Sequence, residues 1–316
     1  MRIHVDTDFA GDPDDACALA MLLGWNGVDV VGVTTVADPD GRRAGYVRRL
    51  LALAGRQEVT VAIGAGSSLT TGQPMGTIPD HNRYWSGDPV SVPEKSTVSS
   101  ADLMKRNLAA GATVVAIGPQ TNLALLELES PGALAGVPVV AMGGWFGPVA
   151  DDLPDLGPAS DWNVQCDTRA AAIVAATAKL TLVPLSTTVG VHLTRRDLPR
   201  LYAAGPVGQL LARQAVAYCD DERKSALASA HLGLPADLLN FHHDPLACAV
   251  AAGWPGVLRQ PVPLSASTDG AILSYTQSGS GRPVDVVTAV DGPMFTSAWL
   301  RAIERLGDSD VIPRLL

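Results

Sequence analysis

Short aliphatic runs alternate with segments of helical periodicity along most of the chain. Runs of strand length occur at residues 28–37, 59–66, 112–118, 137–144 and 180–186, and segments with apolar residues every three or four positions stand between most of them. A near-continuous apolar run such as VDVVGVTTVA is typical of a strand that is covered on both faces of a parallel sheet. The pattern predicts an α/β fold with an open, mostly parallel central sheet flanked by helices.

The C-terminal part of the chain follows a different order. Its predicted elements are a mostly helical region at 195–231, a polar turn leading into a helix at 238–253, strand-like stretches at 257–264, 271–277 and 284–290, and the amphipathic helix MFTSAWLRAIERL. No internal repeat, linker or low-complexity segment interrupts the sequence, so we expect a single domain over residues 1–316.

Two long segments, 67–98 and 145–162, show little periodicity. A loop of this length inside a compact domain is usually functional, often as a lid. The first segment carries His81 and Trp85, which could close over a planar ligand. These side chains could equally pin the loop to the protein surface.

Composition narrows the class of protein. Apolar residues make up 47% and charged residues 17% of the 316 residues, as in a compact folded protein. The formal net charge of −9 argues against a nucleic-acid or anionic-membrane partner, and no apolar run has the length of a membrane span. We expect no signal peptide, because the chain enters a strand within three residues. Its four cysteines are far apart in the sequence, which indicates free thiols in a reducing cytoplasm.

The most informative stretch is IHVDTDFAGDPDDACAL at residues 3–19, where a short strand and a helix flank five carboxylates, those of Asp6, Asp8, Asp12, Asp14 and Asp15. Open α/β sheets bind their ligands in loops that leave the carboxyl ends of strands. One of these aspartates could simply cap the helix. Five like charges in so short a loop require a cation or a shared proton, and a hard cation suits carboxylate oxygens best.

A second polar cluster, HHDPLA at 242–247, precedes a predicted helix. Histidine beside a carboxylate is a candidate acid or base, although a single histidine is more often structural. Other catalytic signatures are missing from the sequence. IGAGSS at 63–68 lacks the third glycine and the lysine of a phosphate-binding loop, and SGSG at 278–281 is not in the strand-to-helix context of a nucleophile elbow.

Together these motifs resemble the inosine/uridine-preferring nucleoside hydrolases, a family of calcium-dependent N-ribohydrolases. The matching pieces are DTDFAGDPDDACAL, VTTV at 33–36, IGPQTNLAL at 117–125, VVAMGG at 139–144, SDWN at 160–163 with the following DTRAA, and HDPLA at 243–247. They occur in the order and spacing of the family over nearly the whole chain. The resemblance implies the nucleoside hydrolase fold, with its active site at the carboxyl ends of the strands.

The resemblance also implies a reaction and a cofactor. The expected reaction is hydrolysis of the N-glycosidic bond of a nucleoside to free base and sugar, with a calcium ion as cofactor. The implied calcium ligands are Asp8, Asp15, the backbone carbonyl of Thr121, and Asp244. Asp8 would also be the general base toward a metal-bound water. A calcium ion accepts six to eight oxygens, so these ligands leave room for water and the sugar hydroxyls.

Further residues follow from the same mapping. Asp14 would bind a ribose hydroxyl, Asp161 and Asn163 would lie at the 5′ end of the sugar, and His243 would protonate the departing base. Bond cleavage develops positive charge on the sugar, which neighbouring carboxylates favour. The nucleobase leaves poorly unless it is protonated or hydrogen-bonded, and a histidine can supply that.

The sequence departs from the family pattern at three places. The first motif has two extra residues between Asp8 and Asp14, which leaves Asp12 without an assigned role. Asp38-Pro39 replaces the Gly-Asn that follows VTTV, and Asp155 stands where an asparagine is expected. As part of this third departure, Asp161, six residues later, replaces a glutamate. We expect these side chains to border a sugar pocket that suits hydroxyls and repels phosphate.

Two rival functions remain open. The Asp-x-Asp after the first strand also resembles haloacid-dehalogenase phosphatases, in which Asp6 would be the nucleophile, although Phe9-Ala10 does not fit their Gly-Thr. The second rival is a calcium-dependent nucleoside-binding protein without turnover. The resemblance further implies a homodimer or homotetramer acting on a small-molecule nucleoside.

Overall fold

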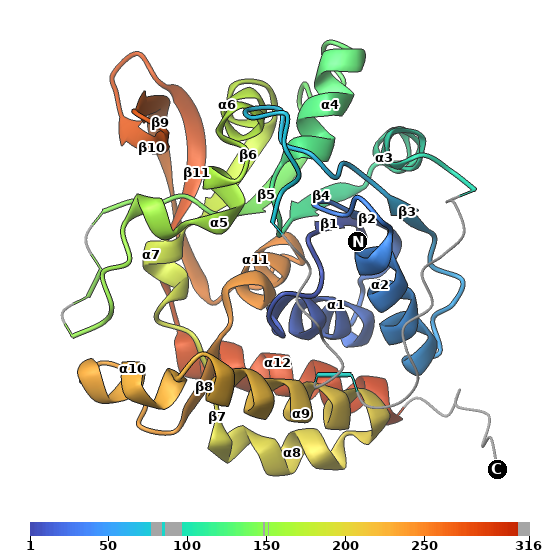
Figure 1. Cartoon of the computed structure of the whole chain (residues 1–316), viewed down its shortest axis with the longest axis vertical. Coiled ribbons are helices and arrows are strands. Elements are labelled where there is room, and N and C mark those ends of the chain that lie inside the picture. The colour runs from blue at the N-terminus through green and yellow to red at the C-terminus, as the bar shows by residue number, and fades with distance from the viewer. Residues whose placement is uncertain (77–83, 86–96, 148, 151, 309–316) are drawn as a thin grey trace.

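The computed structural model describes residues 1–76, 84–85, 97–147, 149–150 and 152–308 and confirms the predicted α/β class (Figure 1). Within these residues a nine-stranded sheet has the order β10-β9-β11-β6-β5-β4-β1-β2-β3. From β3 across to β11 neighbouring strands pair in parallel, whereas β9 pairs antiparallel with β11 and with β10. The strands are β1 (Arg2–Thr7), β2 (Asp29–Thr35), β3 (Val61–Ile63), β4 (Thr113–Ala116), β5 (Pro138–Met142), β6 (Lys179–Val183), β9 (Val257–Asp269), β10 (Ile272–Gln277) and β11 (Arg282–Val290).

Helices cover both faces of the sheet, as Figure 1 shows. One layer contains α1 (Asp14–Gly24), α2 (Arg42–Leu53), α9 (Gly205–Asp221), α11 (His243–Ala251) and α12 (Gly292–Asp308). The other contains α3 (Ser100–Ala109), α4 (Thr121–Glu129) and α6 (Thr168–Thr177). The shorter helices are α5 (Trp162–Gln165), α7 (Leu185–Thr188), α8 (Leu198–Ala203) and α10 (Lys224–Ala230). None of the described helices is long and apolar enough to cross a membrane.

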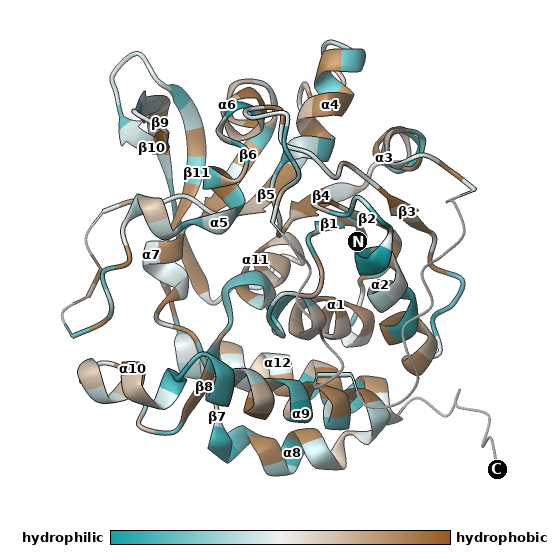
Figure 2. Cartoon of the chain, in the orientation of Figure 1, coloured by the Kyte–Doolittle hydropathy of each residue, from teal (hydrophilic) through white to brown (hydrophobic). Residues whose placement is uncertain are grey.

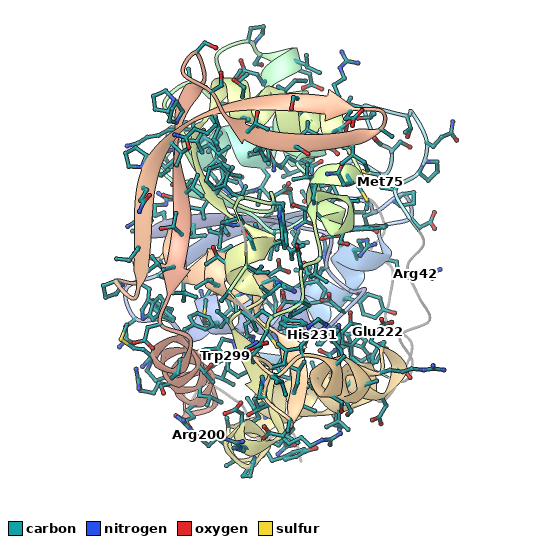
Figure 3. All side chains as sticks on the ribbon, turned by 90° about the vertical axis from the view of Figure 1, so that its left-hand side faces the viewer. Arg42, Met75, Arg200, Glu222, His231 and Trp299 are labelled. Atoms are coloured by element: carbon teal, nitrogen blue, oxygen red, sulfur yellow. The ribbon has the colours of Figure 1, made fainter. Side chains whose placement is uncertain are left out.

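Each helical layer encloses its own hydrophobic core against the sheet. The larger core joins α1, α11 and α12, where the buried Trp299 also donates its indole N–H to the backbone oxygen of Cys17 at 3.1 Å (Figure 3). Hydrophobic residues are concentrated on the central strands, whereas α9 and α12 carry both hydrophobic and hydrophilic positions (Figure 2). This double coverage explains why the parallel strands appear in the sequence as near-continuous apolar runs.

Three predicted elements differ from the structure. The strand predicted at 180–186 ends at Val183, because residues 185–188 form the helix α7. Residues 238–241 form a strand, β8 (Leu238–Phe241), instead of a turn, because they pair antiparallel with β7 (His192–Thr194). The strand predicted at 59–66 is limited to Val61–Ile63. The strands predicted at 257–264, 271–277 and 284–290 are confirmed as β9, β10 and β11.

The topology singles out one place for a ligand. The chain proceeds outward from β1 to β2 and β3 on one side, and from β4 to β5 and β6 on the other. Strand order therefore reverses between the neighbours β1 and β4. Open α/β sheets leave a crevice at such a point, just beyond the carboxyl ends of the strands.

Candidate active site

A cavity of about 690 Å³ lies at this position. The residues that follow β1 and β4, together with the end of β5, contribute to its wall. The predicted site residues that line it are Asp8, Asp14, Asp15, Asp161, Asn163, His243 and Asp244. Segments far apart in the sequence thus meet where the resemblance placed an active site.

The loop after β1 delivers its carboxylates to the cavity through the start of α1. Asp12, which the sequence left without a role, lines the cavity and accepts the backbone N–H of Asp14 at 2.8 Å. Asp14 and Asp15 then occupy the first helical turn and are buried. Negative charge is favoured there by the exposed N–H groups at the start of the helix.

Asp14 and Asp244 connect two helices across the cavity wall. The Oδ2 of Asp14 accepts the backbone N–H of Asp244, in the first turn of α11, at 2.8 Å. The Oδ1 of Asp14 is buried and has no hydrogen-bond partner. Asp15 accepts a hydrogen bond from the Thr7 hydroxyl. An unpartnered carboxylate oxygen in a buried wall is ready to accept from a hydroxyl or to bind a cation.

Burial and mutual repulsion raise the pKa of the clustered carboxyl groups. Burial is the largest cause for Asp8, Asp12, Asp14, Asp15 and Asp244, and charge repulsion between these groups adds to it for the last four. The guanidinium of Arg43, which also lines the cavity, lowers the pKa and so opposes this effect at Asp8, Asp12 and Asp15. Such a cluster favours a bound cation, which would compensate the like charges.

The chemistry of these donors fits a hard divalent cation, because carboxylate oxygens predominate and the Oδ1 of Asp14 is unpartnered. In their present arrangement, no group of three or more His, Cys, Asp or Glu side chains among the described residues is placed to hold a metal ion. The residue types therefore suit a hard divalent cation.

The two carboxylate oxygens of Asp8 have different neighbours. Its Oδ2 accepts the indole N–H of Trp162 at 2.9 Å. Its Oδ1 lies over Gly118, where a Cβ atom would come within 2.7 Å of it. A side chain at position 118 would collide with Asp8, so the glycine allows the carboxylate to approach the end of β4.

Among the described residues, His243 is the histidine that lines the cavity. Its Nδ1 lies 2.6 Å from the hydroxyl oxygen of Thr188, and its ring stacks on Phe241 with centroids 5.2 Å apart. Burial lowers its pKa to about 3, helped by the charges of Lys224 and His192. The ring is therefore neutral here, and it could act as an acid only where a ligand raises its pKa. Its neighbour His242 packs on Trp299 at 4.5 Å and does not line the cavity.

Asp161 and Asn163 lie together at the wall formed after β5. Asp161 caps α5 by accepting the N–H of Val164 at 3.0 Å, and it also accepts the N–H of Gly144. Burial nevertheless raises its pKa to about 6. Asn163 donates from Nδ2 to the backbone oxygen of Met142 at 3.2 Å. This bond does not use its Oδ1, which can accept from another group.

Some predicted residues are not brought to the cavity. Thr121 lies in the first turn of α4 and donates its hydroxyl to Asp167 at 2.8 Å, whereas Ile117, at the end of β4, lines the cavity instead. Asp155 is exposed away from it. Asp38 is buried and accepts the backbone N–H groups of Arg43 and Ala44.

Of the two residues predicted to close over the ligand, the structure describes Trp85. Trp85 is buried, stacks on Tyr46 with centroids 5.1 Å apart, and lines a small neighbouring hollow instead of the main cavity. It therefore pins its segment to the core, which was the alternative interpretation. His81 lies outside the described residues.

Several cavity residues were missed by sequence reasoning. They are Arg43, Ile117, Trp162, Leu185, Tyr218 and Glu222, the last of which follows α9 (Figure 3). Trp162 stood inside the SDWN motif and could have been found there. Tyr218 and Glu222 are four residues apart, the spacing that places two side chains on one helical face, but nothing local indicates that this face meets the cavity.

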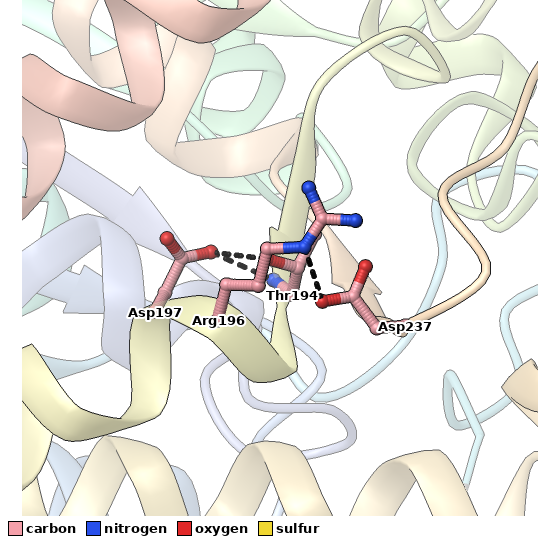
Figure 4. Close-up of polar contacts among 4 residues, drawn as sticks. All are labelled: Thr194, Arg196, Asp197 and Asp237. Atoms are coloured by element: carbon pink, nitrogen blue, oxygen red, sulfur yellow. Dashed lines mark hydrogen bonds and ion pairs between the residues drawn. The ribbon is translucent and has the colours of Figure 1, made fainter.

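A second hollow of about 540 Å³ lies between the β7 region and α12. Its arginines are already paired, Arg196 with Asp237 at 3.1 Å and Arg200 with Glu304 at 2.7 Å. Asp197 accepts from the backbone and hydroxyl of Thr194 and thereby closes the turn (Figure 4). With these charges compensated, the hollow presents no convergent reactive groups.

Comparison with known proteins gives a consistent result. A family model described as inosine-uridine preferring nucleoside hydrolase matches residues 3–297. The pyrimidine-specific ribonucleoside hydrolase RihA of Citrobacter koseri is 33% identical over 220 residues, covering 65% of this chain and 68% of that protein. A solved plant nucleoside hydrolase has a TM-score of 0.81 at 22% identity, covering 96% of this chain and 98% of its own. A purine-preferring ribonucleoside hydrolase from Gardnerella vaginalis has a TM-score of 0.82 at 20% identity, covering 97% and 99% respectively.

Proposed function

The chain belongs to the inosine-uridine preferring nucleoside hydrolases, which release base and sugar by hydrolysing the N-glycosidic bond, and we propose that it performs this reaction in the cavity beyond β1 and β4. One observation carries the proposal. Carboxylates from the loop after β1, a carboxylate and a histidine from the start of α11, and the Asp161–Asn163 pair converge on one cavity at the point of strand-order reversal. A glycosidase needs such carboxylates around the reacting sugar.

Asp8 is the proposed general base. Its carboxylate would remove a proton from the water that attacks the anomeric carbon of the sugar. Because Trp162 occupies Oδ2, the proton goes to Oδ1, the oxygen that lies at the end of β4. The surrounding carboxylates favour the positive charge that develops on the sugar as the bond to the base breaks.

The proposed cofactor is a calcium ion held by Asp8, Asp15, Asp244 and one backbone oxygen. We assign the backbone ligand to Ile117 in place of Thr121, because Ile117 lines the cavity. When bound, a hard cation lowers the pKa of a water and binds sugar hydroxyls. Asp15→Ala should abolish calcium binding in a calorimetric titration with the metal alone, and full occupancy in that variant would contradict the ligand assignment.

The proposed sugar contacts divide between two walls. Asp14 offers its unpartnered Oδ1 to a ribose hydroxyl on the side of α1. Asp161 and Asn163 border the 5′ end of the sugar from α5 and the residue before it. Carboxylates accept hydrogen bonds but cannot donate them, so this environment suits hydroxyls and disfavours phosphate. We therefore propose unphosphorylated nucleosides as the substrates.

His243 is the proposed group at the leaving base. Its Nδ1 is held by Thr188, so Nε2 is the ring nitrogen available to the base. If it assists departure, His243→Ala should slow nucleosides with poor leaving groups by about 10²- to 10⁴-fold. A ribosyl nitrophenol, whose leaving group needs no proton, should be barely affected. An equal loss on both substrates would mean that His243 positions the sugar or supports Asp244.

The position of Asp6 argues against the phosphatase, and an assay for released sugar distinguishes the hydrolase from a binding protein. Asp6, the nucleophile required of a phosphatase, is fully buried and accepts from Asn122 at 2.7 Å, and it does not line the cavity. A binding protein without turnover would fill the same cavity but release no sugar. The test is a panel of purine and pyrimidine nucleosides with free reducing sugar as the readout. No sugar from any nucleoside in the presence of calcium would refute the proposed function.

A further inference from the structure

The loop between β1 and α1 needs support that its own sequence does not provide. Ala10 has a φ of +72°, a conformation that costs free energy for any residue with a side chain. The loop also carries several of the clustered carboxylates, which repel one another. A loop with strained backbone and repelling charges stays in place only where neighbouring groups hold it.

Arg43 supplies this support from the first turn of α2. Its Nη1 donates to three successive backbone oxygens of the loop, those of Asp8, Phe9 (3.0 Å) and Ala10. Its Nε donates to the backbone oxygen of Ala37 at 2.9 Å. The side chain is 3% exposed, so these bonds form in surroundings that exclude water. One guanidinium thus joins the loop after β1 to the loop after β2.

Asp38 holds Arg43 in turn. Its Oδ1 accepts the backbone N–H of Arg43 at 3.0 Å, and its Oδ2 accepts from the Thr35 hydroxyl at 2.8 Å and the Ala44 N–H at 3.0 Å. These bonds fix the start of α2 against the end of β2. The two departures from the family motifs, a longer acidic loop and an aspartate after VTTV, are therefore connected through one arginine.

We propose that Arg43 is the positioning residue of the acidic loop and that Asp38 acts through it. The inference rests on the proposed function in one respect, namely that Asp8, whose backbone oxygen Arg43 binds, is the general base. The role is assigned through Nε and Nη1 of Arg43, which donate to backbone oxygens of two loops. Its planar fork reaches two loops at once, which a single ammonium group cannot do.

Arg43→Lys tests this role because it keeps the charge and removes the fork. We expect kcat to fall about 10- to 100-fold with KM nearly unchanged, since displacement of the base by a fraction of an ångström affects the attack and not the binding. The same factor should apply to a nucleoside and to a ribosyl nitrophenol, because Asp8 acts on the water in both reactions. Arg42→Lys, at the exposed neighbouring position (Figure 3), is the matched control and should behave as wild type.

Hydrogen–deuterium exchange of the peptide covering residues 8–12 supplies a readout without turnover. Exchange should be faster in Arg43→Lys than in wild type and unchanged in Arg42→Lys. Asp38→Asn is the milder second variant, because it keeps one acceptor oxygen. Both effects, the loss in kcat and the faster exchange, should occur in this variant and should be smaller than in Arg43→Lys.

The outcomes separate this inference from the proposed function. Wild-type kcat in Arg43→Lys, a rise in KM alone, or unchanged exchange of residues 8–12 would each overturn the positioning role. If wild type itself releases no sugar from any nucleoside, the proposed function fails, while faster exchange in Arg43→Lys would still support the role of Arg43 in holding the loop.

Discussion

Replacement of Trp162 by phenylalanine should test how the geometry of the general base contributes to turnover. Trp162 begins α5, and its indole N–H donates to the Oδ2 of Asp8 at 2.9 Å. The ring also packs against Gly76, where a Cβ atom would come within 2.9 Å of it. Phenylalanine keeps an aromatic ring at this position and removes the donor, together with part of the ring surface that packs against Gly76.

The size of the effect follows from the bond and from its exposure. A hydrogen bond to an ionised group contributes about 1.5–3 kcal/mol. Trp162 is 51% exposed, so the lower end of this range applies. A loss of about 1.5 kcal/mol in the transition state corresponds to about a tenfold fall in kcat. Without the indole, Asp8 can rotate and present either oxygen to the water, which reduces the fraction of productive encounters.

The assay is steady-state kinetics on a nucleoside and on a ribosyl nitrophenol, with calcium present. We expect kcat to fall by the same factor on both substrates and KM to change little. Trp162→Ala removes the ring as well, and it should raise KM because the ring lines the cavity. Wild-type kcat in Trp162→Phe, or a loss confined to the nucleoside, would refute the assignment of the indole to Asp8.

Three further changes test other parts of the site. Thr188→Val removes the partner of His243 and should lower kcat about tenfold on nucleosides but not on a ribosyl nitrophenol, with Thr188→Ser restoring most of the rate. A 5′-deoxynucleoside should lose about tenfold or more in kcat/KM, and Asp161→Ala should narrow that gap; comparable turnover of a 5′-monophosphate would contradict the placement of the sugar. Asn122→Ala removes the amide that donates to the buried Asp6 at 2.7 Å. The free energy of unfolding, measured in urea, should fall by about 2–4 kcal/mol, and a change below about 1 kcal/mol would argue against a stabilising role of this hydrogen bond.

The parallel sheet could be predicted because burial on both faces leaves a strong local pattern. Aliphatic runs such as VVGVTT mark their strands without knowledge of the partners. The short strands carry no such pattern. Residues 238–241 are a strand only because residues 192–194, distant in the sequence, pair with them, and a polar HHD follows directly. Local sequence therefore favoured a turn where tertiary pairing produces a strand.

The acidic part of the site could be predicted for a similar reason. Several carboxylates within a few residues of one strand must share an environment wherever the fold places that strand. The supporting side chains lack this property. Arg43 is 33 to 35 residues from the oxygens that it binds in the acidic loop, and Trp162 is 154 residues from Asp8. Since backbone oxygens are common to every residue type, no sequence pattern indicates which arginine will bind them.

The residues predicted for the sugar pocket differ in whether they reach the cavity, because motif position does not determine side-chain direction. Asp38, Asp155 and Asp161 were expected to border the sugar, yet only Asp161 lines the cavity. Its two oxygens already accept backbone N–H groups, so it contributes a compensated charge. The proposed discrimination against phosphate therefore rests mainly on the cluster after β1. Arg43 lies in the same wall and directs its Nη1 to backbone oxygens of the acidic loop, so its charge opposes the repulsion among these carboxylates.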